Sequence, residues 1–137
     1  LKYQKQIISN AKAMADEFQR QGVRVVSGGT DNHLMVIDIS LFGGDSKKMQ
    51  DELDKVGIYV NRSAIPFDKR PPYYPSGIRL GSPAITIRGL KEKESREIVR
   101  LIVSLIKNIK NKGIKNQIKK RVKEIVKKFP IYEDFQW

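Results

Sequence analysis

Apolar residues recur every three or four positions in four segments of the chain, which is typical of amphipathic helices. The pattern predicts one helix over residues 3–20, a second from Asp45 and Ser46 to Gly57, and two closing helices separated by Gly113 and ended by Pro130. The apolar stripes consist of Ile7, Ala11, Met14 and Phe18; of Met49, Leu53 and Val56; of Ile98, Leu101, Ile102, Leu105 and Ile109; and of Ile114, Ile118, Val122, Ile125, Val126 and Phe129.

Shorter apolar runs between these helices predict strands at 23–26, 34–39 and 58–60 and around Arg79. The first two strands are separated by a short polar connection, so we expect them to form a hairpin-like pair. Residues 61–76 contain four prolines, which predicts a long loop without regular structure. Together the elements predict an α+β fold, in which helices pack on one face of a small, mainly antiparallel sheet.

The segment 76–83, SGIRLGSP, places Arg79 inside an apolar strand. A buried guanidinium without an anionic partner is strongly unfavourable. Its planar fork suits a carboxylate held by two parallel hydrogen bonds. Arg79 is therefore either half of an internal ion pair or the residue that binds the carboxylate of a ligand. Gly77 and Gly81 are expected to let neighbouring backbone approach closely.

Composition excludes several classes of site and of protein. The 137 residues predict a single domain, and they include no cysteine and only one histidine, His33. Disulfides and thiolate metal sites are thereby excluded, and a metal site is not expected. The sequence shows neither a membrane helix nor a signal peptide, so we expect a cytoplasmic protein without membrane contact.

The formal net charge of +12 is concentrated near the C-terminus. Residues 91–128 hold 14 Lys and Arg but only 4 Glu. Such a run indicates either a solvated lysine face or a surface that binds polyanions. Because this segment contains no aromatic residue to stack on bases, we expect nucleic-acid binding to be non-specific at most.

Three segments together resemble a known family: VVSGGTDNHL at 25–34, VNRSAIPFD at 60–68 and SGIRLG at 76–81. Their order and spacing are similar to the C-terminal domain of serine hydroxymethyltransferase, over residues 3 to about 107. The resemblance implies the small domain of a fold-type I enzyme that depends on pyridoxal phosphate. We expect residues 1–112 to form that domain and residues 113–137 to add a basic amphipathic helix and tail packed on it.

The resemblance also implies roles for individual residues. Arg79 would bind the carboxylate of the amino-acid substrate, while Ser63 and the segment Pro71, Pro72 and Tyr73 would contact folate. Family members often carry asparagine at position 63 and Ser-Pro-Phe at 71–73, so this chain departs from the pattern there. The alternative is a proline-stiffened surface loop.

The motif around the single histidine is expected to be structural. His33 is predicted to be a hydrogen-bonded packing residue, and Asp31 and Asn32 are predicted to satisfy turn backbone groups. Gly28 and Gly29 do not make a phosphate loop, because no Gly-Lys-Ser/Thr follows them.

The function implied by the resemblance belongs to a longer parent enzyme, a homodimer or tetramer. It would interconvert serine plus tetrahydrofolate with glycine plus 5,10-methylenetetrahydrofolate. The family's catalytic and main cofactor-binding residues lie in an N-terminal domain, and the chain opens without an initiator methionine, so we expect an inactive C-terminal piece. Two alternatives remain: the small domain of another fold-type I enzyme, and a stand-alone basic nucleic-acid-binding domain.

Overall fold

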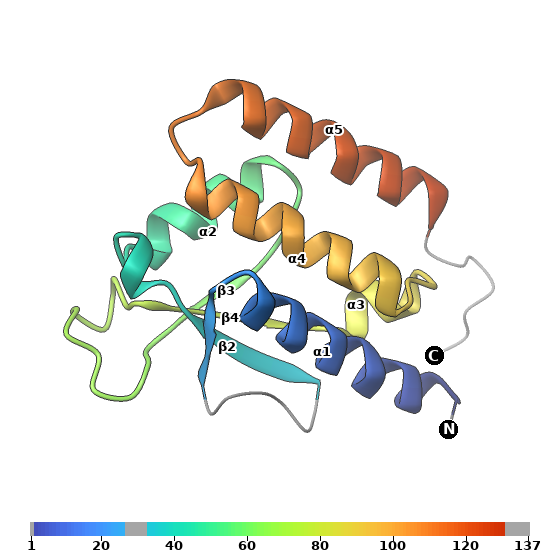
Figure 1. Ribbon diagram of the computed structural model, residues 1–137, viewed down its shortest axis with the longest axis horizontal. Coiled ribbons are helices and arrows are strands. Elements are labelled where there is room, and N and C mark those ends of the chain that lie inside the picture. Colours follow the sequence, from blue (N-terminus) through green and yellow to red (C-terminus); the bar gives the residue numbers. More distant parts are fainter. Residues whose placement is uncertain (1, 27–32, 131–137) are drawn as a thin grey trace.

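The computed structural model describes residues 2–26 and 33–130. Over these residues the fold is α+β, as predicted: a four-stranded antiparallel sheet in the order β1-β2-β4-β3 with helices packed against it (Figure 1). The elements are α1 (Lys2–Arg20), β1 (Arg24–Val25), β2 (Leu34–Asp38), the 3-10 turn η2 (Ser40–Phe42), α2 (Ser46–Lys55), β3 (Asn61–Ser63), β4 (Gly77–Gly81), α3 (Pro83–Ile87), α4 (Glu92–Lys107) and α5 (Lys112–Lys128).

The two faces of the sheet differ because side chains alternate along a strand. Met35 and Ile37 of β2 and Ile78 and Leu80 of β4 are buried in the core beneath the helices. The opposite face, which we call the outer face, carries no described helix (Figure 1). It is formed by Leu34, Val36 and Asp38 of β2, by Gly77, Arg79 and Gly81 of β4, and by Asn61 and Ser63 of β3.

The structure corrects the predicted third strand. Ile58 and Val60 are buried and Tyr59 is 80% exposed, so the alternation is present, but the residues paired in the sheet are Asn61–Ser63. A hydrophobic alternation marks which side chains are buried, whereas a ladder also requires a neighbouring strand in register. The predicted hairpin-like pair is confirmed, since β1 and β2 are antiparallel.

Helix boundaries near the C-terminus also differ from the prediction. The short helix α3, with Pro83 in its first turn, follows β4 and is not among the predicted helices. α4 ends at Lys107, so Ile109 lies beyond it. Gly113 lies inside the first turn of α5, whose N-cap is Asn111; the Asn111 side chain accepts a hydrogen bond of 3.1 Å from the Ile114 amide.

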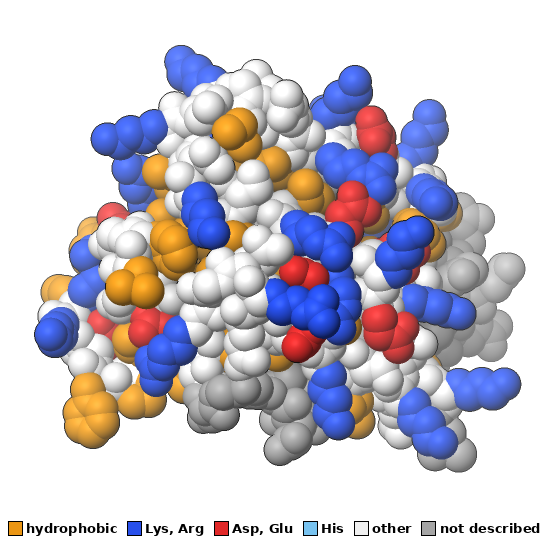
Figure 2. All heavy atoms as spheres, viewed as in Figure 1, with side chains coloured by type: hydrophobic (Ala, Val, Ile, Leu, Met, Phe, Trp, Pro, Cys, Tyr) orange, Lys and Arg blue, Asp and Glu red, His pale blue; other side chains and the backbone are white. Residues whose placement is uncertain are grey.

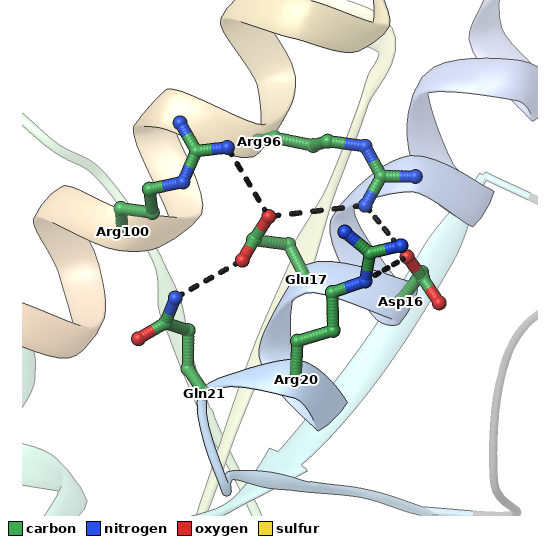
Figure 3. Close-up of polar contacts among 6 residues, drawn as sticks. All are labelled: Asp16, Glu17, Arg20, Gln21, Arg96 and Arg100. Atoms are coloured by element: carbon green, nitrogen blue, oxygen red, sulfur yellow. Dashed lines mark hydrogen bonds and ion pairs between the residues drawn. The ribbon is translucent and has the colours of Figure 1, made fainter.

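An ion-pair network joins α1 to α4 (Figure 3). The buried carboxylate of Glu17 lies 3.3 Å from Nη2 of Arg100 and accepts a hydrogen bond of 3.1 Å from Gln21. Arg96 donates to Asp16 at 2.6 Å. The hydrogen bond from Arg96 lowers the pKa of Asp16 below its usual value. These contacts hold α1 against α4 over the sheet.

A buried set of polar contacts joins α1 to the end of β4. The Asn10 amide, which is fully buried, donates to Thr86 Oγ1 and to the Leu90 carbonyl oxygen, both at 2.9 Å. The Ser82 hydroxyl donates to the carbonyl oxygen of Ile7 at 2.6 Å. Because buried polar groups lose stability when left unpaired, these contacts fix where β4 ends relative to α1.

The basic helix α5 packs on the domain through a narrow apolar stripe. Ile118, Val122 and Ile125 are buried, as the periodicity predicts. Lys115 pairs with Glu52 of α2 at 3.1 Å, and Arg121 pairs with a glutamate of α4. Figure 2 shows Lys and Arg side chains scattered among acidic ones over the face of the molecule that is drawn. Non-specific polyanion binding stays a prediction. The division of the chain into a domain at 1–112 and an added helix and tail at 113–137 also stays a prediction.

Candidate functional site

Arg79 lies at the centre of the outer face. Its neighbours across the sheet are Val36 of β2 and Asn61 of β3. The side chain is exposed, although the residues before and after it in β4 are buried. Within residues 2–26 and 33–130, no carboxylate forms an ion pair with Arg79. The described structure therefore contains no internal ion pair for this arginine.

Asp38 is the acidic residue closest in register to Arg79 on the outer face, and its carboxylate binds residues other than Arg79. Asp38 lies opposite Gly77, and so diagonally across from Arg79. Its carboxylate pairs with Nη1 of Arg24 at 2.9 Å and accepts hydrogen bonds from the backbone and hydroxyl of Ser40. Burial would raise the pKa of Asp38, but the hydrogen bonds from Ser40 and Arg24 lower it below its usual value. With Asp38 held in this way, Arg79 is available to an anionic ligand.

Two glycines beside Arg79 allow backbone and side chains to approach closely. A Cβ on Gly77 would collide with the carbonyl oxygen of Ser63, and one on Gly81 would lie 2.9 Å from Cδ2 of Leu34. The predicted close approach at both positions is thus confirmed. Residues two apart in a strand face the same side, so Gly77 and Gly81 are the neighbours of Arg79 along β4. Neither glycine has a side chain.

Ser63 shares the outer face with Arg79. It pairs with Gly77 at the end of β3 and is half-buried, and its hydroxyl donates a weak hydrogen bond of 3.3 Å to the Ala64 carbonyl. Asn61, two residues earlier, lies directly opposite Arg79. The sequence reasoning gave Asn61 no role, although its spacing from Ser63 is that of two residues on one face of a strand.

The segment Pro71 to Tyr73 lies near the other side of β3. The Tyr73 ring, 61% exposed, has the Arg62 guanidinium 4.8 Å from its centre. Arg62 pairs with Ile78, whose side chain faces the helices. Tyr73 also lines a depression of about 380 Å³ between α2 and β3. Ser63 and Tyr73 are therefore on opposite sides of the edge strand, rather than together.

Asp68 organises the loop that joins β3 to β4. Its carboxylate accepts hydrogen bonds from the amides of Ile65 at 3.3 Å, Arg70 at 3.0 Å and Ser76 at 2.8 Å, and from the Ser76 hydroxyl at 2.8 Å. Burial raises its pKa, but these donors outweigh burial and lower the pKa to about 2. Phe67, just before it, has a positive φ of 58°, a costly conformation that the surrounding bonds maintain.

Replacing Asp68 with Asn is expected to destabilise the chain by about 2 kcal/mol at pH 7. Because the pKa of Asp68 in the folded chain lies below the usual value of 3.8, its stabilisation is complete above that value and is lost as the pH falls toward 2. Urea unfolding of the wild type and the variant at pH 7, 4 and 2.5 measures this difference. Asp54→Asn, at an exposed site on α2, is the control, with a change below about 0.5 kcal/mol. A stability difference between Asp68→Asn and wild type that does not shrink at pH 2.5 would contradict the assignment.

Of the motif around the single histidine, the structure describes His33 and not the residues at 28–32. The side chain of His33 is exposed, so the expectation that it packs in the structure is wrong. Its contact is through the backbone, since its carbonyl accepts a hydrogen bond of 3.1 Å from the Ser82 amide. Gly28, Gly29, Asp31 and Asn32 lie outside the described residues.

The described part of the chain contains neither a candidate metal site nor a membrane-spanning helix. Over residues 2–26 and 33–130, no group of three or more His, Cys, Asp or Glu side chains is placed to hold a metal ion. No helix in the same ranges is both long enough and apolar enough to cross a membrane.

The structure is an α+β domain whose sheet is buried under helices on one face and exposes the Arg79 guanidinium on the outer face. The family model described as serine hydroxymethyltransferase matches residues 1–102. A serine hydroxymethyltransferase of Leptospira biflexa is 49% identical over 129 residues, 94% of this chain and 31% of the relative. One from Lactobacillus johnsonii is 47% identical over 130 residues, 94% of this chain and 32% of the relative. The chain belongs to the serine hydroxymethyltransferase family and spans about a third of the length of these relatives.

Proposed function

We propose that the chain is the C-terminal domain of a serine hydroxymethyltransferase. The parent enzyme interconverts serine plus tetrahydrofolate with glycine plus 5,10-methylenetetrahydrofolate. The observation that carries the proposal is the position of Arg79, exposed and without an ion pair among the described residues, within the part of the chain matched to the family. A homodimeric or tetrameric, cytoplasmic parent belongs to the same proposal.

The role proposed for Arg79 is to bind and orient the substrate carboxylate. Its guanidinium can donate two parallel hydrogen bonds to both carboxylate oxygens, which fixes the direction in which the α-carbon points. Such orientation contributes several kcal/mol to lowering a reaction barrier. Asp38 supports this role because Arg24 and Ser40 keep its carboxylate occupied and away from Arg79.

Pyridoxal phosphate would supply an electron sink for bond changes at the α-carbon. The described strands that form the outer face contain no lysine that could hold its aldehyde carbon. Because the chain spans only about a third of the length of its relatives, we assign binding of the cofactor mainly to the remainder of the parent, and we expect the isolated 137 residues to be inactive.

For tetrahydrofolate we propose contacts on both sides of the edge strand β3. Ser63 has its hydroxyl on the outer face, and Tyr73 has an exposed ring that contacts the Arg62 guanidinium. Pro71 and Pro72 are exposed, and a turn closed by the Tyr74 amide and the Pro71 carbonyl at 2.9 Å supports them. An aromatic ring on a stiff turn suits the flat ring system of a folate.

Expression of the full-length parent gene tests this function. The purified enzyme is expected to form glycine from serine only when tetrahydrofolate is present, and the isolated chain is expected to form none. Activity of the parent on a different amino acid, with no response to folate, would instead favour the small domain of another fold-type I enzyme.

Replacing Tyr73 with Ala in the parent should raise the KM for tetrahydrofolate about fivefold, since an aromatic contact contributes about 1 kcal/mol and 1.4 kcal/mol is tenfold. The KM for serine should change by less than twofold. Steady-state kinetics with each substrate varied in turn measures both constants. Tyr59→Ala is the matched control, because Tyr59 is 80% exposed and lines the same depression. Equal losses for both substrates would indicate a folding defect instead.

A further inference from the structure

Asn61 and Arg79 form a pair of exposed polar side chains on the outer face. They are directly opposite one another in the ladder between β3 and β4. The Cβ atoms of such a pair are about 4.5–5.5 Å apart. Both residues are exposed, and within residues 2–26 and 33–130 the side chain of Asn61 makes no hydrogen bond.

The chemistry of this pair matches a carboxylate. A carboxylate has two oxygens and about four lone-pair sites, of which a bidentate arginine occupies two. The amide of Asn61 carries two further donors on a neutral group, so it can occupy another lone pair without competing for the charge of Arg79. Gly77 and Gly81, the neighbours of Arg79 on this face of β4, add no side chain of their own beside the guanidinium.

An asparagine at this position also leaves Arg79 available. A carboxylate on β3 opposite the guanidinium would form an ion pair across the strands and would hold Arg79 away from a ligand. The one acidic side chain on the described strands of this face, Asp38, is already bound by Arg24. The Asn61 amide can therefore donate hydrogen bonds at a position where a carboxylate would pair with Arg79 and block ligand binding.

We propose that Asn61 is a second substrate-binding residue, whose side-chain amide donates a hydrogen bond to the amino-acid carboxylate held by Arg79. This inference rests on the proposed function. It extends the site from one strand to two, so that the β3–β4 register sets how the substrate is held. The competing explanation is an edge-strand residue that is polar only because it contacts solvent.

Two variants of the full-length parent separate these explanations. Asn61→Ala is expected to raise the KM for serine between about 10- and 100-fold, the effect of one hydrogen bond to a charged group. The kcat and the KM for tetrahydrofolate should stay within about twofold. Asn61→Asp should raise the KM for serine by at least about 100-fold, because the new carboxylate competes with the substrate for Arg79. Asn116→Ala, at an exposed site on α5, is the control and should change nothing.

The outcomes separate this inference from the proposed function. If Arg79→Ala abolishes serine turnover while both Asn61 variants keep the wild-type KM for serine, the inference is overturned and the proposed function stands. If Arg79→Ala itself keeps the wild-type KM for serine, both are overturned. Circular dichroism and thermal unfolding identify a variant that fails to fold. Should Asn61→Ala be such a variant, Asn61→Ser, which keeps a shorter donor, should fall between Asn61→Asp and the wild type in its KM for serine. A wild-type KM for serine in Asn61→Ser or Asn61→Asp would overturn the inference.

Discussion

Replacing Arg79 with Ala in the parent enzyme is expected to lower kcat/KM for serine by about 10³-fold or more. The variant loses two charge-assisted hydrogen bonds to the carboxylate and, with them, the orientation of the α-carbon. Arg79→Lys should recover little of this loss, because an ammonium group carries the charge but lacks the planar fork. Initial rates over a range of serine concentrations, at saturating tetrahydrofolate, measure the change.

The control for this experiment is Arg20→Ala. Arg20 is an exposed arginine of α1 that pairs only with Asp16 of the same helix among the described residues, so its removal should leave kcat/KM within about twofold. A parent carrying Arg79→Ala with nearly normal kcat/KM would show that Arg79 has a structural role only. Because Arg79 is exposed and contributes no described ion pair, its loss should not unfold the domain.

Local patterns in the sequence were enough to predict most of the helices and the fold class. Periodic apolar residues identified α1, α2, α4 and α5, because each helix buries one continuous stripe. α3 was missed, since five residues are too short for a stripe to be recognised. β3 was placed too early because Ile58 and Val60 are buried outside the ladder. Burial can be read locally, whereas strand pairing depends on a distant neighbour.

The site was predictable only where a single residue type carried the signal. Arg79 was identified because a guanidinium buried within an apolar strand would need an anionic partner, although the structure shows this side chain to be exposed. Whether it had an internal partner depended on Asp38, which is adjacent only in the folded sheet and is bound by Arg24. The position of Asn61 depended on the β3–β4 register, which the loop closed by Asp68 fixes. No pattern in the sequence specifies these contacts.

Gly77→Ala is expected to destabilise the chain by about 3 kcal/mol or more, the upper end of the cost of overpacking. The added Cβ would collide with the carbonyl oxygen of Ser63, and it would lie 2.9 Å from Cγ2 of Ile65 and 3.1 Å from Cγ1 of Val36. A backbone atom cannot move aside as the end of a flexible side chain can, so β3 must shift relative to β4. Urea unfolding of the chain measures the loss of stability.

The second glycine variant, Gly113→Ala, shows that the effect depends on the close approach and not on the exchange of glycine for alanine. Gly113 lies in the first turn of α5, where a Cβ would meet only Oδ1 of Asn111 at 3.4 Å, an ordinary contact. Alanine is the better helix former, so this variant should be equal to the wild type or more stable by up to about 1 kcal/mol. In the parent, Gly77→Ala should also raise the KM for serine, because the shift of β3 moves Asn61 away from Arg79. A Gly77→Ala chain as stable as the Gly113→Ala chain would mean that β3 and β4 are not packed as closely as the structure has them.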